Sequence, residues 1–167
     1  MLQKKICMLG SFSVGKTSLV RRFVSGIFSD KYQTSIGVKI DNKTVEISGE
    51  EVKLLLWDIY GEDRFQKVQM SYLNGMSGYL LVVDPTRRET LEDALDLQQR
   101  VKESKGEVPS VLVLNKSDLL KDWDIDSDRI ALLERNGQIV LCTSAKTGEG
   151  VELAFSRLAR AMLESPA

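Results

Sequence analysis

Short apolar runs alternate along this chain with longer segments whose apolar residues recur at helical spacing. The apolar runs are mostly continuous, and they lie at Ile6–Leu9, Val52–Trp57, Tyr79–Val83, Val111–Leu114 and Ile139–Leu141. Runs of this length without regular alternation are typical of strands in a parallel sheet that is covered on both faces. We therefore predict a sheet whose strands are buried from both sides.

One segment, Val38–Ile47, behaves differently because its apolar residues alternate with polar ones. Such alternation indicates a strand with one open face, as is found near the edge of a sheet. The stretch Ser48-Gly49-Glu50-Glu51 follows it and is expected to be the turn that joins this strand to the next one as a hairpin.

Helical spacing is found in the segments Lys16–Val24, Thr90–Val101 and Val151–Met162. In the second of these, Thr90 is a candidate N-cap, and the predicted buried face consists of Leu91, Ala94, Leu95, Gln98 and Val101. Alternating strands and helices predict an α/β layered protein. A length of 167 residues, without an internal repeat or linker, predicts a single domain over residues 1–167.

Composition excludes several kinds of chemistry. The chain contains no histidine, so a Ser-His-Asp triad, a Cys-His dyad and the usual zinc sites are excluded. The net charge of -1, from 23 basic and 24 acidic residues, argues against a nucleic-acid-binding protein. The two cysteines, Cys7 and Cys142, lie in apolar runs, and we expect both to be buried thiols in a reducing compartment.

The ends of the chain carry no targeting signal that we recognise. Met1–Lys5 leads directly into an apolar run that is too short for the apolar core of a signal peptide, and no stretch approaches the ~18 apolar residues of a transmembrane helix. Leu163–Ala167 contains no cysteine that could accept a prenyl group. We therefore expect a cytoplasmic chain whose given residues include no direct membrane anchor. Without a lipid on a longer tail, recruitment to a membrane would need a bound partner.

The strongest chemical signal is the segment Gly10–Thr17, with the sequence GSFSVGKT, between an apolar run and a helical segment. It matches the phosphate-binding P-loop, in which glycines let successive backbone N–H groups point at phosphate oxygens. The Lys16 ammonium can bridge the outer phosphates, and the Thr17 hydroxyl can ligate Mg²⁺.

Two later segments favour guanine over adenine. In Asn115–Asp118, the Asp118 carboxylate can accept hydrogen bonds from the N1–H and the exocyclic amine of guanine, a donor pair that adenine lacks. Asn115 and the stem of Lys116 can frame the base. Thr143–Lys146 follows the last apolar run and can offer backbone N–H groups to guanine O6. The predicted ligand is therefore GTP or GDP.

With these motifs the sequence resembles a Ras-superfamily small GTPase, nearest the Rab branch, from Lys5 to about Leu163. The motifs, in order, are the P-loop, Tyr32–Gly37, Trp57–Gly61, Asn115–Asp118 and Thr143–Lys146. The resemblance implies a P-loop NTPase G domain. Its six-stranded mixed sheet is mostly parallel with one antiparallel edge strand and is flanked by five helices. The nucleotide would lie at the carboxyl edge of the sheet, as is general for open α/β sheets.

The resemblance also implies roles for individual residues. Ser18 would face the α-phosphate, Phe28 would pack edge-on against guanine, and the Gly61 N–H would sense the γ-phosphate. The implied nucleotide-binding residues are Ser13, Val14, Gly15, Lys16, Thr17, Ser18, Phe28, Ser35, Gly61, Asn115, Lys116, Asp118, Ser144, Ala145 and Lys146.

The implied metal site holds Mg²⁺ between Thr17, Ser35 and Asp58, with Asp58 acting through water. Ser35 stands where the family usually has Thr, and Thr34 is the neighbouring alternative. The implied catalytic residues are Lys16, Gly61 and Glu62.

Three departures from the family pattern bear on hydrolysis. Glu62 replaces the Gln that usually orients the attacking water, Phe12 replaces a small P-loop residue, and Tyr60 replaces Ala. An ionised carboxylate brings negative charge towards a negative transition state and offers no amide N–H. We predict a switch that hydrolyses GTP slowly. The alternatives are ordinary drift in a competent enzyme and a GTP-binding scaffold with negligible hydrolysis, while a P-loop kinase is disfavoured by the guanine motifs.

The expected partners are effectors, exchange factors and GTPase-activating proteins that bind the switch regions. Aromatic side chains are common interface anchors, and the candidates here are Tyr32, Tyr60, Phe65 and Tyr72. Arg64 could donate positive charge to the reaction in cis, but we interpret it as an exposed surface charge. The pairs Arg21-Arg22 and Arg87-Arg88 are interpreted in the same way.

Overall fold

The structure is a computed structural model that describes residues 1–26, 28, 37–59 and 67–165 of the chain. Its centre is a six-stranded sheet in the order β2-β3-β1-β4-β5-β6. The strands are β1 Leu2–Gly10, β2 Val38–Ile47, β3 Glu50–Ile59, β4 Gly78–Val83, β5 Ser110–Leu114 and β6 Ile139–Cys142. The edge strand β2 is antiparallel to β3, and all other pairs are parallel. The predicted mixed sheet is confirmed.

All six predicted strand segments form strands, but the hairpin turn is shorter than expected. Ile47 pairs with Glu50, so Glu50 and Glu51 belong to β3 and the turn consists of Ser48 and Gly49 alone. Both turn residues have positive φ, 52° and 82°. This backbone suits a two-residue hairpin because its twist matches that of the strands.

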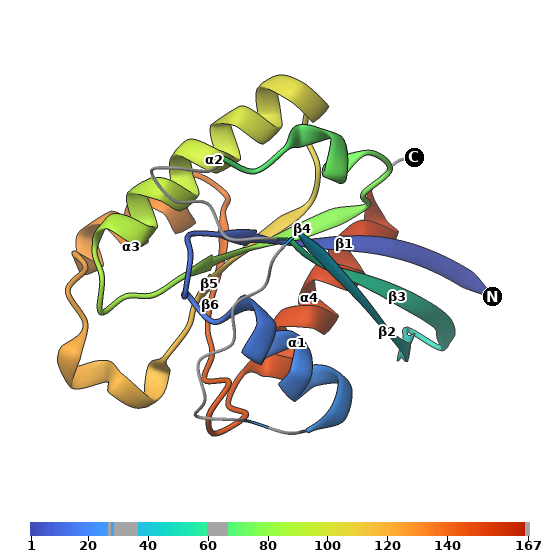
Figure 1. The fold of residues 1–167 in the computed structure, drawn as a ribbon, viewed down its shortest axis with the longest axis horizontal. Coiled ribbons are helices and arrows are strands. Elements are labelled where there is room, and N and C mark those ends of the chain that lie inside the picture. The colour runs from blue at the N-terminus through green and yellow to red at the C-terminus, as the bar shows by residue number, and fades with distance from the viewer. Residues whose placement is uncertain (27, 29–36, 60–66, 166–167) are drawn as a thin grey trace.

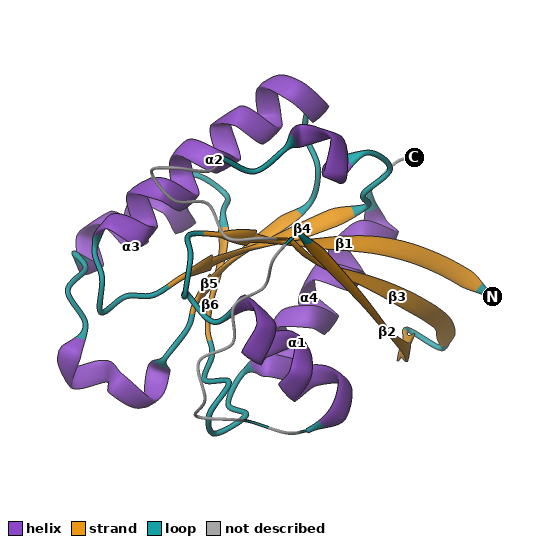
Figure 2. Ribbon diagram, viewed as in Figure 1, coloured by secondary structure: helices purple, strands orange, loops and turns teal. Residues whose placement is uncertain are grey.

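Helices cover both faces of the sheet (Figure 1). In the described residues the α-helices are α1 Lys16–Ser25, α2 Glu89–Lys105, α3 Ser127–Arg135 and α4 Val151–Glu164, and 3₁₀ helices lie at Met70–Leu73 and Ser117–Asp122. The secondary structure is coloured in Figure 2. These helices and the mixed sheet confirm the expected fold class. Residues 60–66, which include the end of the Trp57–Gly61 motif, lie outside the described residues.

Alternate residues of the central strand β1 point into two separate cores. Ile6 and Met8 lie in the core under α1 and α4, which buries side chains such as Phe23 and Phe155 in a stacked pair. Cys7 and Leu9 lie in the core under α2. This two-sided burial explains why the central strands read as continuous apolar runs.

Helix α2 differs from its prediction at Thr90, Leu97 and Gln98. It begins at Glu89 with Arg88 as the N-cap residue, so the N-cap assigned to Thr90 is wrong. Thr90 is instead buried, and its hydroxyl exchanges hydrogen bonds with the backbone N–H and O of Asp84. Leu97 is buried on the inner face, whereas Gln98 is half-buried and donates to Gln138.

Helix α3 was not predicted from the sequence, because none of its residues is buried and its apolar periodicity is weak. The prediction that both cysteines are buried is wrong for Cys142, which is exposed at the end of edge strand β6. Cys7 is fully buried, and burial raises the pKa of its thiol to about 12. In the described residues, no helix has the length and apolar character needed to cross a membrane.

Candidate nucleotide-binding site

Three of the loops that carry predicted motifs meet at the carboxyl edge of the parallel strands, and Asn115 connects them. This residue follows β5 and is 2% exposed. Its Nδ2 donates to the backbone O of Val14 at 3.0 Å, and its Oδ1 accepts from the Thr143 hydroxyl at 3.0 Å. One amide therefore joins the P-loop after β1, the loop after β5 and the loop after β6.

The P-loop backbone can approach its neighbours this closely only because of two glycines. A Cβ on Gly10, which has φ of 150°, would lie 2.4 Å from the backbone O of Val82. A Cβ on Gly15, with φ of 105°, would lie 2.3 Å from Asn115 Nδ2. These glycines therefore fix the curve of the loop just before α1 begins at Lys16.

Lys16 is buried inside this loop, with 6% of its surface exposed. Its ammonium donates to the backbone O of Gly10 at 3.3 Å and of Ser11 at 3.0 Å. Burial lowers the pKa of Lys16 to about 8, although the nearby Asp58 carboxylate acts to raise it. A buried cation surrounded by loop backbone is suited to stabilising an anion such as a phosphate.

The residues expected to hold Mg²⁺ on the sheet side of the loop lie in contact. Thr17, in the first turn of α1, donates from its hydroxyl to Asp58 Oδ2 at 2.6 Å. Asp58 lies near the end of β3 and is 1% exposed. A hydroxyl and a carboxylate are hard oxygen donors of the kind that Mg²⁺ prefers, so these residues fit the ion. The third expected ligand, Ser35, lies outside the described residues.

The residues expected to bind guanine lie on the loops after β5 and β6. Asp118 is exposed, and its Oδ1 accepts from the Ser144 hydroxyl at 2.7 Å. Lys116 has a left-handed backbone with φ of 64°, and its carbonyl accepts from the Trp123 indole at 3.1 Å. Ala145 is buried, whereas Lys146 is exposed. The carboxylate expected to recognise guanine is thus fixed by a neighbour and still open to solvent.

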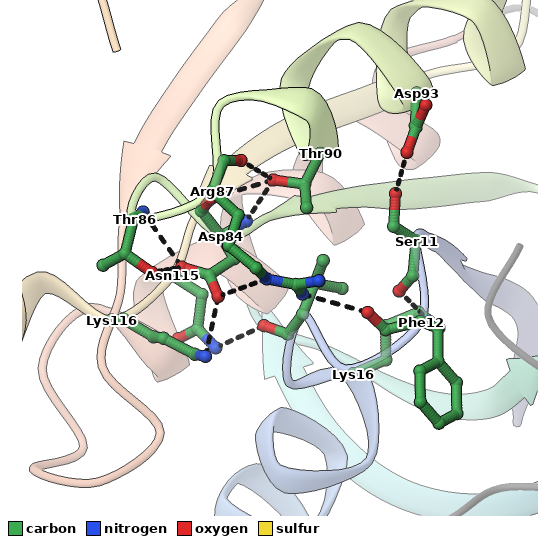
Figure 3. A network of polar contacts seen from close by, with 11 residues as sticks. Ser11, Phe12, Lys16, Asp84, Thr86, Arg87, Thr90, Asp93, Asn115 and Lys116 are labelled. Atoms are coloured by element: carbon green, nitrogen blue, oxygen red, sulfur yellow. Dashed lines mark hydrogen bonds and ion pairs between the residues drawn. The ribbon is translucent and has the colours of Figure 1, made fainter. Parts of the chain in front are cut away.

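A buried carboxylate that sequence reasoning missed lies between these loops. Asp84, directly after β4, is 1% exposed and accepts from Lys116 Nζ at 2.7 Å and from Arg87 Nε at 3.1 Å (Figure 3). Burial raises the pKa of Asp84, but hydrogen bonds from Lys116, Thr86 and Arg87 outweigh it and lower the pKa below its ordinary value. Its position directly after a strand, like that of Asn115, was the available signal.

Two arginines interpreted as surface charges are in fact structural donors. Arg87 donates from Nη2 to the backbone O of Phe12 at 2.9 Å. Arg22 donates from Nε to the backbone O of Ala145 at 2.8 Å and from Nη2 to that of Lys146. Arg88, by contrast, is exposed as expected and pairs with Asp124. The interpretation was wrong for Arg87 and Arg22 because their acceptors lie far away in the sequence.

Other predicted positions are placed only in part. Phe28 is half-buried and packs against the core under α1 and α4, and Tyr72 is half-buried against the core under α2. The structure describes Ser18 as half-buried in α1 and Ser13 as exposed in the P-loop. The predictions that fall outside the described residues are those for Tyr32, Thr34, Ser35, Tyr60, Gly61, Glu62, Arg64 and Phe65.

Comparison with known proteins agrees with this geometry. A model of the Ras family matches residues 5–164. Ras-related protein Rab-4 of Dictyostelium discoideum is 37% identical over 163 residues, which are 95% of this chain and 78% of that protein. Human Ras-related protein Rab-30 is 37% identical over 157 residues, 93% of this chain and 77% of that protein. Canine Ras-related protein Rab-13 is 33% identical over 161 residues, 95% of this chain and 79% of that protein. The chain therefore belongs to the Ras family of GTP-binding proteins and is Rab-like.

Proposed function

We propose that this protein is a molecular switch that binds GTP or GDP together with Mg²⁺ and hydrolyses GTP slowly. The observation that carries the proposal is the double hydrogen bond of Asn115, which joins the P-loop to the loop after β6 while Asp118 stays open to solvent. These bonds join the loop expected to bind phosphate to the loops expected to bind guanine, which supports recognition of a guanine nucleotide.

Different residues of this chain would bind the nucleotide, hold the metal ion and stabilise the charge that develops during hydrolysis. Lys16 and the P-loop N–H groups would hold the phosphates and stabilise charge on the transferred phosphoryl group. Thr17 and Ser35 would hold Mg²⁺, with Asp58 behind it. The ion, when bound, neutralises charge between the β- and γ-phosphates. Gly61 would bind the γ-phosphate through its N–H, so that loss of this phosphate would release both switch regions, around Tyr32–Gly37 and Trp57–Gly61, from the nucleotide. Effector, exchange-factor and activating proteins would bind these regions.

The slow rate of GTP hydrolysis follows from Glu62, which stands at the position that orients the attacking water. Glu62 cannot donate an amide N–H to the γ-phosphate, and its negative charge opposes the charge that develops in the transition state. Phe12 favours a second candidate, a GTP-binding scaffold with negligible hydrolysis, because its half-buried phenyl ring extends from the P-loop itself. Single-turnover hydrolysis by the purified protein separates the two.

Asp118→Asn tests the nucleotide assignment. Xanthine carries a carbonyl where guanine carries its exocyclic amine, so an asparagine amide can donate where the carboxylate accepted. The variant can still accept from the Ser144 hydroxyl, which preserves the loop. We expect the unmodified protein to prefer GDP over ADP, and the variant to lose affinity for GDP by about 10² or more and to gain affinity for xanthosine diphosphate.

Asp122→Asn is the matched control, because Asp122 is exposed in the same 3₁₀ helix, Ser117–Asp122. Competition against a fluorescent GDP analogue measures all the affinities. If ATP and GTP compete equally for the unmodified protein, the guanine assignment is wrong.

A further inference from the structure

Side chains from three different elements hold the carbonyl groups of the P-loop. Lys16 donates to the carbonyls of Gly10 and Ser11, and Asn115 donates to that of Val14. The carbonyl of Phe12, between them, accepts from Arg87 Nη2 at 2.9 Å. Figure 3 shows the Arg87 guanidinium between the loop after β4 and the P-loop, where it reaches the Phe12 carbonyl.

The Phe12 carbonyl is part of the same peptide group as the Ser13 N–H. A trans peptide group is planar, and its O and H atoms point in opposite directions; the described residues contain no cis peptide bond. A donor that holds the carbonyl on one side therefore turns the N–H to the other side. Ser13 also has φ of 63°, a conformation that residues other than glycine rarely adopt without support from their surroundings.

Arg87 is itself held in place by a buried acceptor. Its Nε donates to Asp84 Oδ2 at 3.1 Å, and Asp84 is 1% exposed. Nε and Nη2 belong to one rigid planar group, so the position of Asp84 sets the direction in which Nη2 points. A lysine has a single ammonium on a flexible stem and cannot reproduce this two-point geometry.

We propose that Arg87 is a positioning residue for nucleotide binding: it clamps the Phe12–Ser13 peptide so that the Ser13 N–H is presented to the outer phosphates. This inference rests on the proposed function. It goes beyond it by assigning to a residue of the β4–α2 loop a role in binding the β- and γ-phosphates. Because Ser18 is expected to face the α-phosphate and Asp118 the base, the contribution of Arg87 should depend on phosphates beyond the first.

The test compares GDP with GMP, since both carry guanine and an α-phosphate but only GDP carries a β-phosphate. Affinities are measured for the parent, Arg87→Met, Arg87→Lys and the control Arg88→Met, which removes the exposed partner of Asp124. We expect Arg87→Met to weaken GDP binding by about tenfold, the scale of one charge-assisted hydrogen bond, and GMP binding by less than twofold. Arg87→Lys should show most of the same loss of GDP affinity, and Arg88→Met should bind GDP as tightly as the parent.

Each result leads to one conclusion. Equal losses for GDP and GMP in Arg87→Met would show that Arg87 acts on the base loop or on the whole fold, and would overturn the proposal. An Arg87→Lys variant that binds GDP like the parent would also overturn it, because charge alone would then suffice. If Arg87→Met does not fold, Arg87→Lys alone tests the proposal, through the loss of GDP affinity compared with the loss of GMP affinity. Failure of the parent to bind GDP would instead refute the proposed function itself.

Discussion

The buried carboxylate of Asp84 offers a quantitative test of how the site is held together. Asp84→Asn preserves the size of the side chain and the acceptor for the Thr86 N–H, at 3.0 Å. It removes the negative charge that binds Lys116 and Arg87. Removing one partner of a fully buried ion pair lowers the free energy of unfolding by about 3–5 kcal/mol. The Lys116 and Arg87 side chains are 34% and 37% exposed, so water replaces part of the lost interaction. We expect a loss of about 2–3 kcal/mol of unfolding free energy.

Urea unfolding in saturating GDP and Mg²⁺ measures this loss, and the separately measured GDP affinity of each variant removes the contribution of the ligand. Asp124→Asn is the control, because it removes the acceptor of an exposed ion pair with Arg88. Exposed pairs contribute little to stability, so the control should unfold like the parent. A loss below about 1 kcal/mol in Asp84→Asn would refute the assignment of Asp84 as a buried anchor.

The pH dependence of the stability difference between the parent and Asp84→Asn gives a second test of the role of Asp84. The pKa of Asp84 is lower in the folded protein than its ordinary value of 3.8. A group with a depressed folded pKa stabilises the protein fully above its unfolded pKa, and this stabilisation is lost as the pH falls through the folded pKa. The difference in unfolding free energy between the parent and Asp84→Asn should therefore stay constant from about pH 7 to about pH 5. It should become smaller below about pH 4. A difference that persists unchanged at about pH 2.5 would mean that the charge of Asp84 is not its cause.

Two further predictions concern the metal and the hydrolysis step. Thr17→Asn should shift the preference from GTP towards GDP, because GTP depends more on an ion that bridges its β- and γ-oxygens; an unchanged affinity ratio in titration would count against the metal assignment. Glu62→Gln should raise the rate of single-turnover GTP hydrolysis, by less than the rate factor of ~10²–10³ that one catalytic hydrogen-bond donor contributes. If the Phe12 phenyl ring blocks the attacking water, the effects of Glu62→Gln and Phe12→Gly should be non-additive. A parent that hydrolyses GTP faster than Glu62→Gln would show that Glu62 is a competent catalytic residue.

The strands and the P-loop could be predicted because their signals are local. Burial on both faces leaves continuous apolar runs, such as Val111–Leu114, and the loop geometry leaves Gly10 and Gly15 at fixed spacing. The same reasoning failed for Cys142, since an apolar run at the sheet edge is covered less completely than a central one. It also missed α3, whose residues gain too little burial to impose a pattern on the sequence.

The polar anchors of the site could not be predicted because their partners are distant in the sequence. Arg87 lies 75 positions from Phe12, and Arg22 lies 123 positions from Ala145. Nothing near either arginine distinguishes it from a solvated surface charge such as Arg88. Only the sheet topology brings these loops together, because parallel strands deliver their carboxyl ends to one edge whatever their order in the chain.

The arrangement around Asp84 also implies that recognition of the base and of the phosphates is physically coupled. Its carboxylate binds Lys116, from the guanine side, and Arg87, which holds the P-loop at Phe12. Loss of Arg87 should therefore affect the phosphate side alone, whereas loss of Asp84 releases donors on both sides. Both donors bind the same oxygen, Asp84 Oδ2, so a change at Asp84 acts on Lys116 and on Arg87 at once. We therefore expect the loop after β4 to act as part of the proposed binding site, in addition to connecting β4 to α2.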